Sequence, residues 1–287
     1  MLWFLLSLAG AFFDALYFTL IKHSIQKIDR YVFITGIFLC AAAIMFLISA
    51  IVGFPQLNLT FFMAAFSIVG LNFFATLLYL KALQKGDLSL ALPMLAFTPA
   101  FIIVGAFFLL GESPSGGGIA GILIIVLGSY LLGFSEHKGG LRHPLHELMR
   151  SSTIRLMLAV ALIWSITSSL DKLSVINSDP FFAAAFVFLL LGLLFTLFTV
   201  VTGRAKPKQF KAGFPLFLAT AVVLCLIAIS INIAFTTQIV SYVISIKRFA
   251  LVFGVLFGAI IFHEKRFEKR MEAALFMVAG AILIALA

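Results

Sequence analysis

Long apolar runs, almost empty of charge, dominate this chain of 287 residues. A helix that crosses about 30 Å of hydrocarbon at 1.5 Å per residue needs about 20 apolar residues. Ten runs approach or exceed that length: residues 2–21, 31–53, 59–80, 88–110, 117–134, 154–171, 180–202, 213–234, 238–262 and 271–287. They are continuous rather than alternating, which excludes a membrane β-barrel. The sequence therefore predicts an all-α polytopic membrane protein with ten transmembrane helices.

The composition excludes the classes that compete with this interpretation. Hydrophobic residues make up 63% of the chain and charged residues 11%, against about 45–50% and about 25% in soluble domains. So few polar residues cannot cover a soluble globule, and disorder requires the opposite balance. A net charge of +9 is also found in proteins that bind nucleic acid, but here the basic residues lie mainly in gaps between runs rather than on one face. Two cysteines, both in apolar runs, exclude a disulfide scaffold.

The placement of Lys and Arg predicts the orientation in the membrane. Of the 20 basic residues, seventeen lie at the gaps that follow the first, third, fifth, seventh and ninth runs. Only Lys172 lies at a gap on the other side of the membrane, after the sixth run, and the remaining two, Lys247 and Arg248, lie inside the ninth run. Loops rich in Lys and Arg stay in the cytoplasm. We therefore expect both termini outside, in the cytoplasmic membrane of a bacterium or an archaeon.

The two halves of the chain match weakly at a spacing of 150 to 152 residues. The matching pairs include Lys22 with Lys172, Phe97 with Phe249, Glu112 with Glu264, and Gly128 with Gly280. The first and third loops of the first half carry its Lys and Arg residues, whereas in the second half the second and fourth loops carry most of them. The second half is therefore expected to have the inverted topology in the membrane. The sequence predicts two inverted five-helix repeats, 1–135 and 154–287, joined by a cytoplasmic loop at 136–153. Such repeats are typical of secondary transporters, which bind substrate between them near the midplane.

A family resemblance follows from the fourth and fifth runs. The stretch from Leu92 to Pro99, then Glu112, Gly121 and Gly128, resembles the EamA-type ten-helix group of the drug/metabolite transporter superfamily. The second half keeps Glu264 and Gly280 but has Leu251 where Pro99 would fall. The resemblance implies alternating-access transport, with substrates that range across the family from amino acids, vitamins and drugs to sugar phosphates.

Three charges lie deep inside the predicted spans, away from the ends of the runs: Asp14, Lys247 and Arg248. A charge at this depth costs about 2.5–3.5 kcal/mol and is by default a functional candidate. Lys247 and Arg248 suit a phosphate or carboxylate. They resemble the Lys-Arg pair that holds the substrate phosphate in plastid phosphate translocators, although Leu95 stands near the place of a further basic residue found there.

Two other interpretations of these charges remain open. In the first, Asp14 and the cations form an internal ion pair that holds two helices together. In the second, Asp14 is a proton-coupling carboxylate, because burial raises its pKa and a nearby cation lowers it. Since one acid cannot neutralise two cations, we expect one cation to remain for an anion.

Four polar residues inside spans are further candidates for substrate binding: Tyr17, Asn72, Tyr79 and Tyr242. Tyr17 lies one turn beyond Asp14, and Asn72 shares a face with Tyr79. Such residues also form hydrogen bonds between helices without any functional role. Glu112 and Glu264 lie at helix ends, where we expect them to stabilise turns or pair with cations.

No catalytic signature for a serine hydrolase, zinc protease or nucleotide-binding loop is present in the sequence. The sequence therefore predicts a transporter rather than an enzyme, without a cofactor, coupled to protons or to exchange. The leading hypothesis is a secondary active transporter of a small anionic metabolite. Alternatives are an exporter of amino acids or amphipathic compounds, and a lipid-handling protein. The expected partners are a small-molecule substrate and the bilayer, with the chain a monomer or homodimer.

Overall fold

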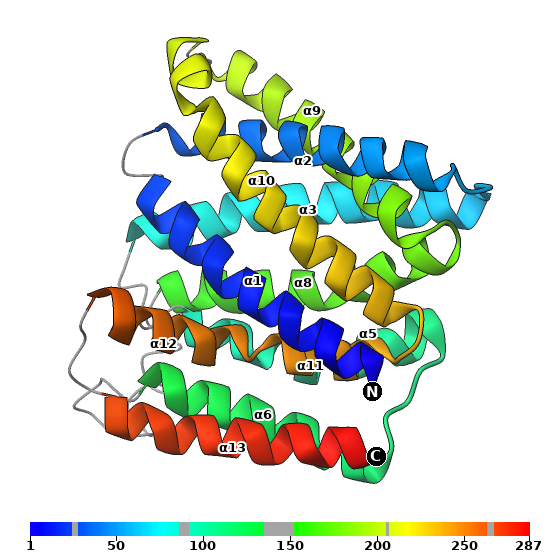
Figure 1. Cartoon of the computed structure of the whole chain (residues 1–287), viewed down its shortest axis with the longest axis vertical. Coiled ribbons are helices and arrows are strands. Elements are labelled where there is room, and N and C mark those ends of the chain that lie inside the picture. Colours follow the sequence, from blue (N-terminus) through cyan, green and yellow to red (C-terminus); the bar gives the residue numbers. More distant parts are fainter. Residues whose placement is uncertain (25–27, 86–91, 135–151, 205–206, 263–266) are drawn as a thin grey trace.

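The computed structural model describes residues 1–24, 28–85, 92–134, 152–204, 207–262 and 267–287 (Figure 1). Every regular element in these ranges is helical, which confirms the predicted fold class. The elements are α1 (Leu2–Ser24), α2 (Arg30–Val52), α3 (Leu59–Lys85), η1 (Leu92–Phe97), α5 (Thr98–Leu110), α6 (Gly116–Phe134), α8 (Ser152–Ile176), α9 (Pro180–Val201), α10 (Pro207–Phe235), α11 (Val240–Lys247), α12 (Ala250–Phe262) and α13 (Phe267–Leu286).

The surface of these helices is suited to lipid. Six of them, α1, α2, α3, α8, α9 and α10, are long and apolar enough to cross a membrane, and three shorter apolar helices lie elsewhere in the described residues. Large apolar side chains point outward, among them Phe108 (79% exposed) and Leu197 (60%). In water such exposure would be unfavourable, whereas in a bilayer it has no cost. The chain is a multi-pass integral membrane protein.

The fourth and ninth helices are broken, which corrects the two continuous spans expected at 88–110 and 238–262. In the fourth, a 3₁₀ segment ends at Phe97 and α5 begins at Thr98, with Pro99 in the first turn. In the ninth, α11 ends at Lys247, and the amide of Phe249 donates to the Ile246 oxygen at 3.0 Å before α12 begins. The fourth run stays apolar through its break, and the ninth run is apolar on average although Lys247 and Arg248 stand at its break, so mean hydropathy registers neither break.

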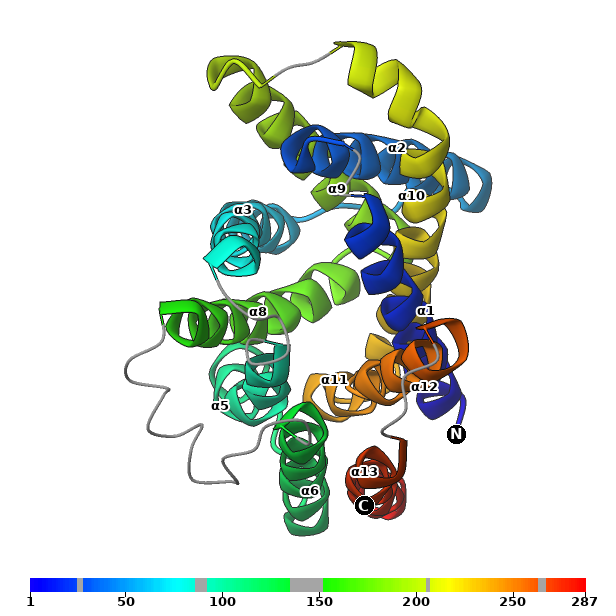
Figure 2. The same ribbon diagram turned by 90° about the vertical axis from the view of Figure 1, so that its left-hand side faces the viewer.

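The two halves interleave rather than pack as separate bodies. The most extensive contacts are α2 with α9, α6 with α13, α3 with α8, and α1 with α10. Each pair joins one helix from each half, as the end-on view shows (Figure 2). In the repeat, α1, α2, α3 and α6 of the first half correspond to α8, α9, α10 and α13 of the second. Replacing each helix by its counterpart turns the α1–α10 pair into the α8–α3 pair and leaves the α2–α9 and α6–α13 pairs as they are. This pattern is the packing expected of two repeats related by a pseudo-twofold axis.

Glycines at the α6–α13 crossing carry the same symmetry. A Cβ at Gly121 would lie 2.7 Å from the Gly280 oxygen, and a Cβ at Gly128 would lie 2.9 Å from the Ala273 oxygen. The two contacts are related by the repeat spacing of 152 residues, because Gly121 corresponds to Ala273 and Gly280 corresponds to Gly128. The two helices therefore approach closely only because glycine lacks a side chain at these positions. By contrast, no atom of the described residues lies within 4 Å of the Cβ position of Gly254 on α12.

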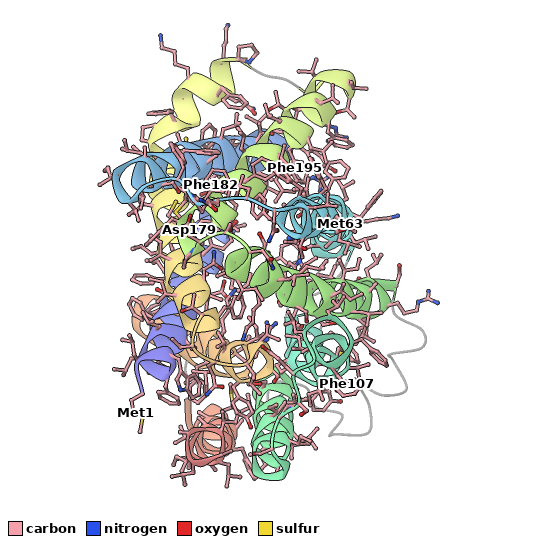
Figure 3. All side chains as sticks on the ribbon, turned by 90° about the vertical axis from the view of Figure 1, so that its right-hand side faces the viewer. Met1, Met63, Phe107, Asp179, Phe182 and Phe195 are labelled. Carbon is pink, nitrogen blue, oxygen red and sulfur yellow. The ribbon has the colours of Figure 1, made fainter. Side chains whose placement is uncertain are left out.

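Both chain termini lie at one end of the bundle, which we call the terminus end (Figure 1). Figure 3 looks onto this end, where Met1 and Asp179 are labelled. Asp179 caps α9 by accepting hydrogen bonds from the amides of Phe181 (2.7 Å) and Phe182 (3.0 Å). The turns between α2 and α3, α5 and α6, α8 and α9, and α10 and α11 also lie at this end.

Candidate functional site

The break in the ninth helix brings charged and polar side chains from four helices together. We call this set the charged cluster: Asp14 and Tyr17 on α1, Tyr79 on α3, Asp171 on α8, and Lys247 and Arg248 at the end of α11. Interrupted helices recur at the binding sites of transporters because their ends offer unpaired backbone groups and dipoles to a ligand. The cluster is therefore the best candidate for the substrate site.

Asp14 and Lys247 form an ion pair, as one of the sequence-based alternatives predicts. Lys247 Nζ lies 3.6 Å from Asp14 Oδ2, and the two side chains are 24% and 12% exposed. This contact links α1 of the first half to α11 of the second. Partial burial reduces the screening of the two charges, so the pair contributes to holding these helices in register.

Asp171 is a cluster member that the sequence reasoning missed. Its side chain is partly buried and close enough to Lys247 for their charges to interact. The sixth span was expected to end at 171, but α8 continues to Ile176, which places Asp171 inside the helix. The argument that one acid faces two cations is therefore wrong, because the described cluster holds two of each.

Arg248 differs from Lys247 in forming no ion pair among the residues that the structure describes. Its Nε atom is buried and without a hydrogen-bond partner among the described residues, and Asp14 acts on it only as an electrostatic neighbour. A buried polar group without a partner is costly, and such a group in a native protein calls for an explanation.

Of the four other candidate residues, two belong to the charged cluster and two make contacts elsewhere. Tyr17 and Tyr79 are electrostatic neighbours of Asp14, and the Tyr79 ring lies 5.8 Å from that of Trp164. Tyr242 instead reaches the α5–α6 turn, where its hydroxyl accepts a hydrogen bond from the Ser115 amide at 3.1 Å. Asn72 lies two turns before Tyr79 on α3, where its backbone oxygen accepts from Thr76 at 2.7 Å.

A second ion pair lies at the terminus end. Lys172 Nζ is 2.5 Å from Glu112 Oε1, and both side chains are largely buried. Lys172 was expected in a loop, but α8 extends four residues beyond it, so it faces the interior of the bundle. Glu112 thus pairs with a cation, one of the two roles expected for it. Its repeat equivalent Glu264 lies outside the described residues.

Inverted five-helix repeats with a broken helix and buried charges between them define the architecture of a secondary transporter. The family comparison agrees: the EamA-like transporter family matches residues 1–134 and again 151–286. The chain belongs to this family, within the drug/metabolite transporter superfamily. It is a membrane transporter rather than an enzyme.

Individual relatives support the assignment without naming a substrate. An uncharacterized transporter of Archaeoglobus fulgidus is 24% identical over 212 residues, which cover 72% of this chain and 69% of the relative. A protein of known crystal structure superposes with a TM-score of 0.78 at 16% identity, over 99% of this chain and 96% of its own. At this identity the superposition shows a shared fold alone.

Proposed function

We propose that the protein is a secondary active transporter of a small metabolite that carries a carboxylate or phosphate group. The observation that carries this proposal is the buried, partnerless Nε of Arg248 at the break between α11 and α12. A guanidinium presents donors in a planar fork that matches both anions. A bound anion would satisfy the donor that the described protein groups leave free.

The surroundings of Arg248 support an anion at this place. α12 begins at Ala250, two residues after Arg248, so the positive end of its dipole lies close to this residue along the chain. Lys247 already pairs with Asp14, and its charge interacts with that of Asp171. We therefore assign anion binding to Arg248 and a positioning role to Lys247, with Tyr17 and Tyr79 as further candidates to line the site.

The repeats suggest how the site would alternate. Repeats 1–135 and 154–287 would rock about the pseudo-twofold axis, with the charged cluster between them, driven by protons or by exchange. We also infer that the terminus end faces away from the cytoplasm, because the Lys- and Arg-rich gaps follow the odd-numbered helices and thus belong to the opposite end.

Exporters of amino acids or amphipathic compounds are the second candidate. The Asp14–Lys247 pair and the balanced count of acids and cations favour it, because a formally neutral cluster requires no anion. In that case the cations are structural. A protein with Asp14→Asn and Lys247→Met together would then still transport.

A ligand screen tests the proposal. Thermal stability of the purified protein is measured against phosphorylated, carboxylated and neutral metabolites, for the unchanged chain, Arg248→Met and the matched control Lys208→Met, which removes an exposed cation on α10. We expect acidic metabolites to raise the unfolding temperature, and Arg248→Met but not Lys208→Met to abolish the shift. Stabilisation by neutral compounds alone, or an unchanged shift in Arg248→Met, would contradict it.

A further inference from the structure

Three segments are tied together at the terminus end by one carboxylate. Glu112, just after α5, pairs through Oε1 with Lys172 of α8 at 2.5 Å, and its Oε2 accepts from the Val240 amide at 2.8 Å. Lys172 also donates to the Gln238 oxygen at 2.5 Å. We call the Glu112–Lys172 pair with these two hydrogen bonds the latch.

The latch joins the two repeats and is shielded from water. Glu112 belongs to the first repeat, whereas Lys172, Gln238 and Val240 belong to the second. The Lys172 and Glu112 side chains are 11% and 14% exposed. Removal of one partner from a shielded ion pair costs far more than removal of one from an exposed pair, because the other charge is left without a partner out of water. The latch is therefore suited to hold the halves together at this end.

Two buried hydroxyls lie close to latch residues in the sequence, one on α8 and one on α11. Ser174 lies two residues beyond Lys172 and Ser241 follows Val240, with 1% and 0% of their surface exposed. Neither Oγ atom has a hydrogen-bond partner among the described residues. Buried polar atoms of this kind are costly in a protein interior. Their presence is explained if water reaches them in another conformation of the same protein.

α11 connects the latch to the charged cluster. Glu112 holds the first amide of this helix, at Val240, and the other end carries Lys247 and Arg248. At 1.5 Å per residue the helix is only about 12 Å long. A helix of about two turns is short and stiff, so a displacement at Val240 would be transmitted to the charged cluster.

We propose that the latch is the gate at the terminus end of the transport path, and that its rupture opens a route to the charged cluster along α8 and α11. In the described conformation the gate is closed. Opening separates Glu112 from Lys172, exposes Ser174 and Ser241 to water, and frees α11 to move with Lys247 and Arg248. This proposal rests on membership of the transporter family and does not depend on the charge of the substrate.

Thiol labelling tests the gate without any substrate. Ser241→Cys is introduced together with Cys40→Ala, while Cys225, which is 3% exposed in a different part of the core, is kept as an internal reporter of folding. The protein in lipid nanodiscs reacts with a charged maleimide, and peptide mass spectrometry follows each thiol separately. We expect the thiol at position 241 to react at least tenfold faster after Lys172→Met or Glu112→Gln.

The matched control is Lys208→Met, which removes an exposed cation from the start of α10 and is expected to leave the labelling rate unchanged. An unchanged rate in both latch variants, or an equal increase in Lys208→Met, would overturn the proposal. If Cys225 also becomes reactive, the variant has unfolded, and the milder variant Glu112→Asp, which keeps the charge but shortens the side chain by one carbon, decides. A Glu112→Asp protein in which only the thiol at position 241 reacts faster supports the gate; one that leaves the labelling rate unchanged, or that unfolds as well, overturns it.

Discussion

The Asp14–Lys247 pair gives a quantitative prediction about charge inside the membrane. At the observed 3.6 Å, an effective dielectric constant of about 20 gives an attraction of roughly 4–5 kcal/mol. Removal of one partner from a buried pair typically costs about 3–5 kcal/mol. Lys247→Met leaves both Asp14 and Asp171 without this cation, whereas Asp14→Asn leaves Lys247 with Asp171. We therefore expect Lys247→Met to lose about 3–5 kcal/mol and Asp14→Asn to lose clearly less.

Thermal unfolding of the purified variants in one detergent measures this difference. For domains of somewhat smaller size, 1 kcal/mol shifts the unfolding temperature by about 2–4 °C, so Lys247→Met should unfold roughly 6–20 °C lower. The double variant should lose less than the sum of the single losses, with a coupling of at least about 1 kcal/mol, and Lys208→Met should change little. Losses that add within about 0.5 kcal/mol would refute the ion pair. If Asp14→Asn loses more stability than Lys247→Met, Asp171 does not act as a second acidic neighbour of Lys247.

Three further predictions concern packing, capping and orientation. Gly280→Ala places a Cβ about 2.6 Å from the Gly121 oxygen and should cost about 1–3 kcal/mol of stability, whereas Gly254→Ala, with open space at its Cβ, should unfold no earlier than the unchanged protein. Asp179→Ala removes the cap of α9 and should lower stability by about 0.5–2 kcal/mol in the same unfolding assay. Alkaline phosphatase fused after Ala287 should be active in a bacterial host, because that enzyme needs the oxidising exterior; an inactive fusion with full expression would reverse the orientation.

Most of the fold follows from the sequence because the bilayer leaves few choices. An apolar run of 20 residues in lipid must satisfy its backbone internally, so each run predicts one helix. The breaks at Phe97 and Phe249 escape this reasoning, since each of the two runs is apolar enough on average to be counted as one continuous span. Pro99 signals the first break. In the ninth helix the signal is different: Lys247 and Arg248 interrupt an apolar run where no proline is present.

The site was only half predictable, because it depends on which helices are neighbours. Asp14, Lys247 and Arg248 stand out from sequence as charges within spans, but nothing local indicates that α8 brings Asp171 beside Lys247. Asp171 was also hidden by a helix end placed five residues too early. Tyr242 shows the opposite case, because its position on the ninth helix suggested the cluster, whereas its hydroxyl contacts Ser115.

Transport in reconstituted vesicles tests the central claim most directly. Proteoliposomes containing the unchanged protein, Arg248→Met or Lys208→Met take up the acidic metabolite that gives the largest thermal stabilisation. A lost hydrogen bond to a charged group is worth about 1.5–3 kcal/mol, so the initial uptake rate at low substrate concentration should fall at least about tenfold in Arg248→Met and stay unchanged in Lys208→Met. Uptake by Arg248→Met at the rate of the unchanged protein would contradict the assignment of Arg248 as the anion-binding group.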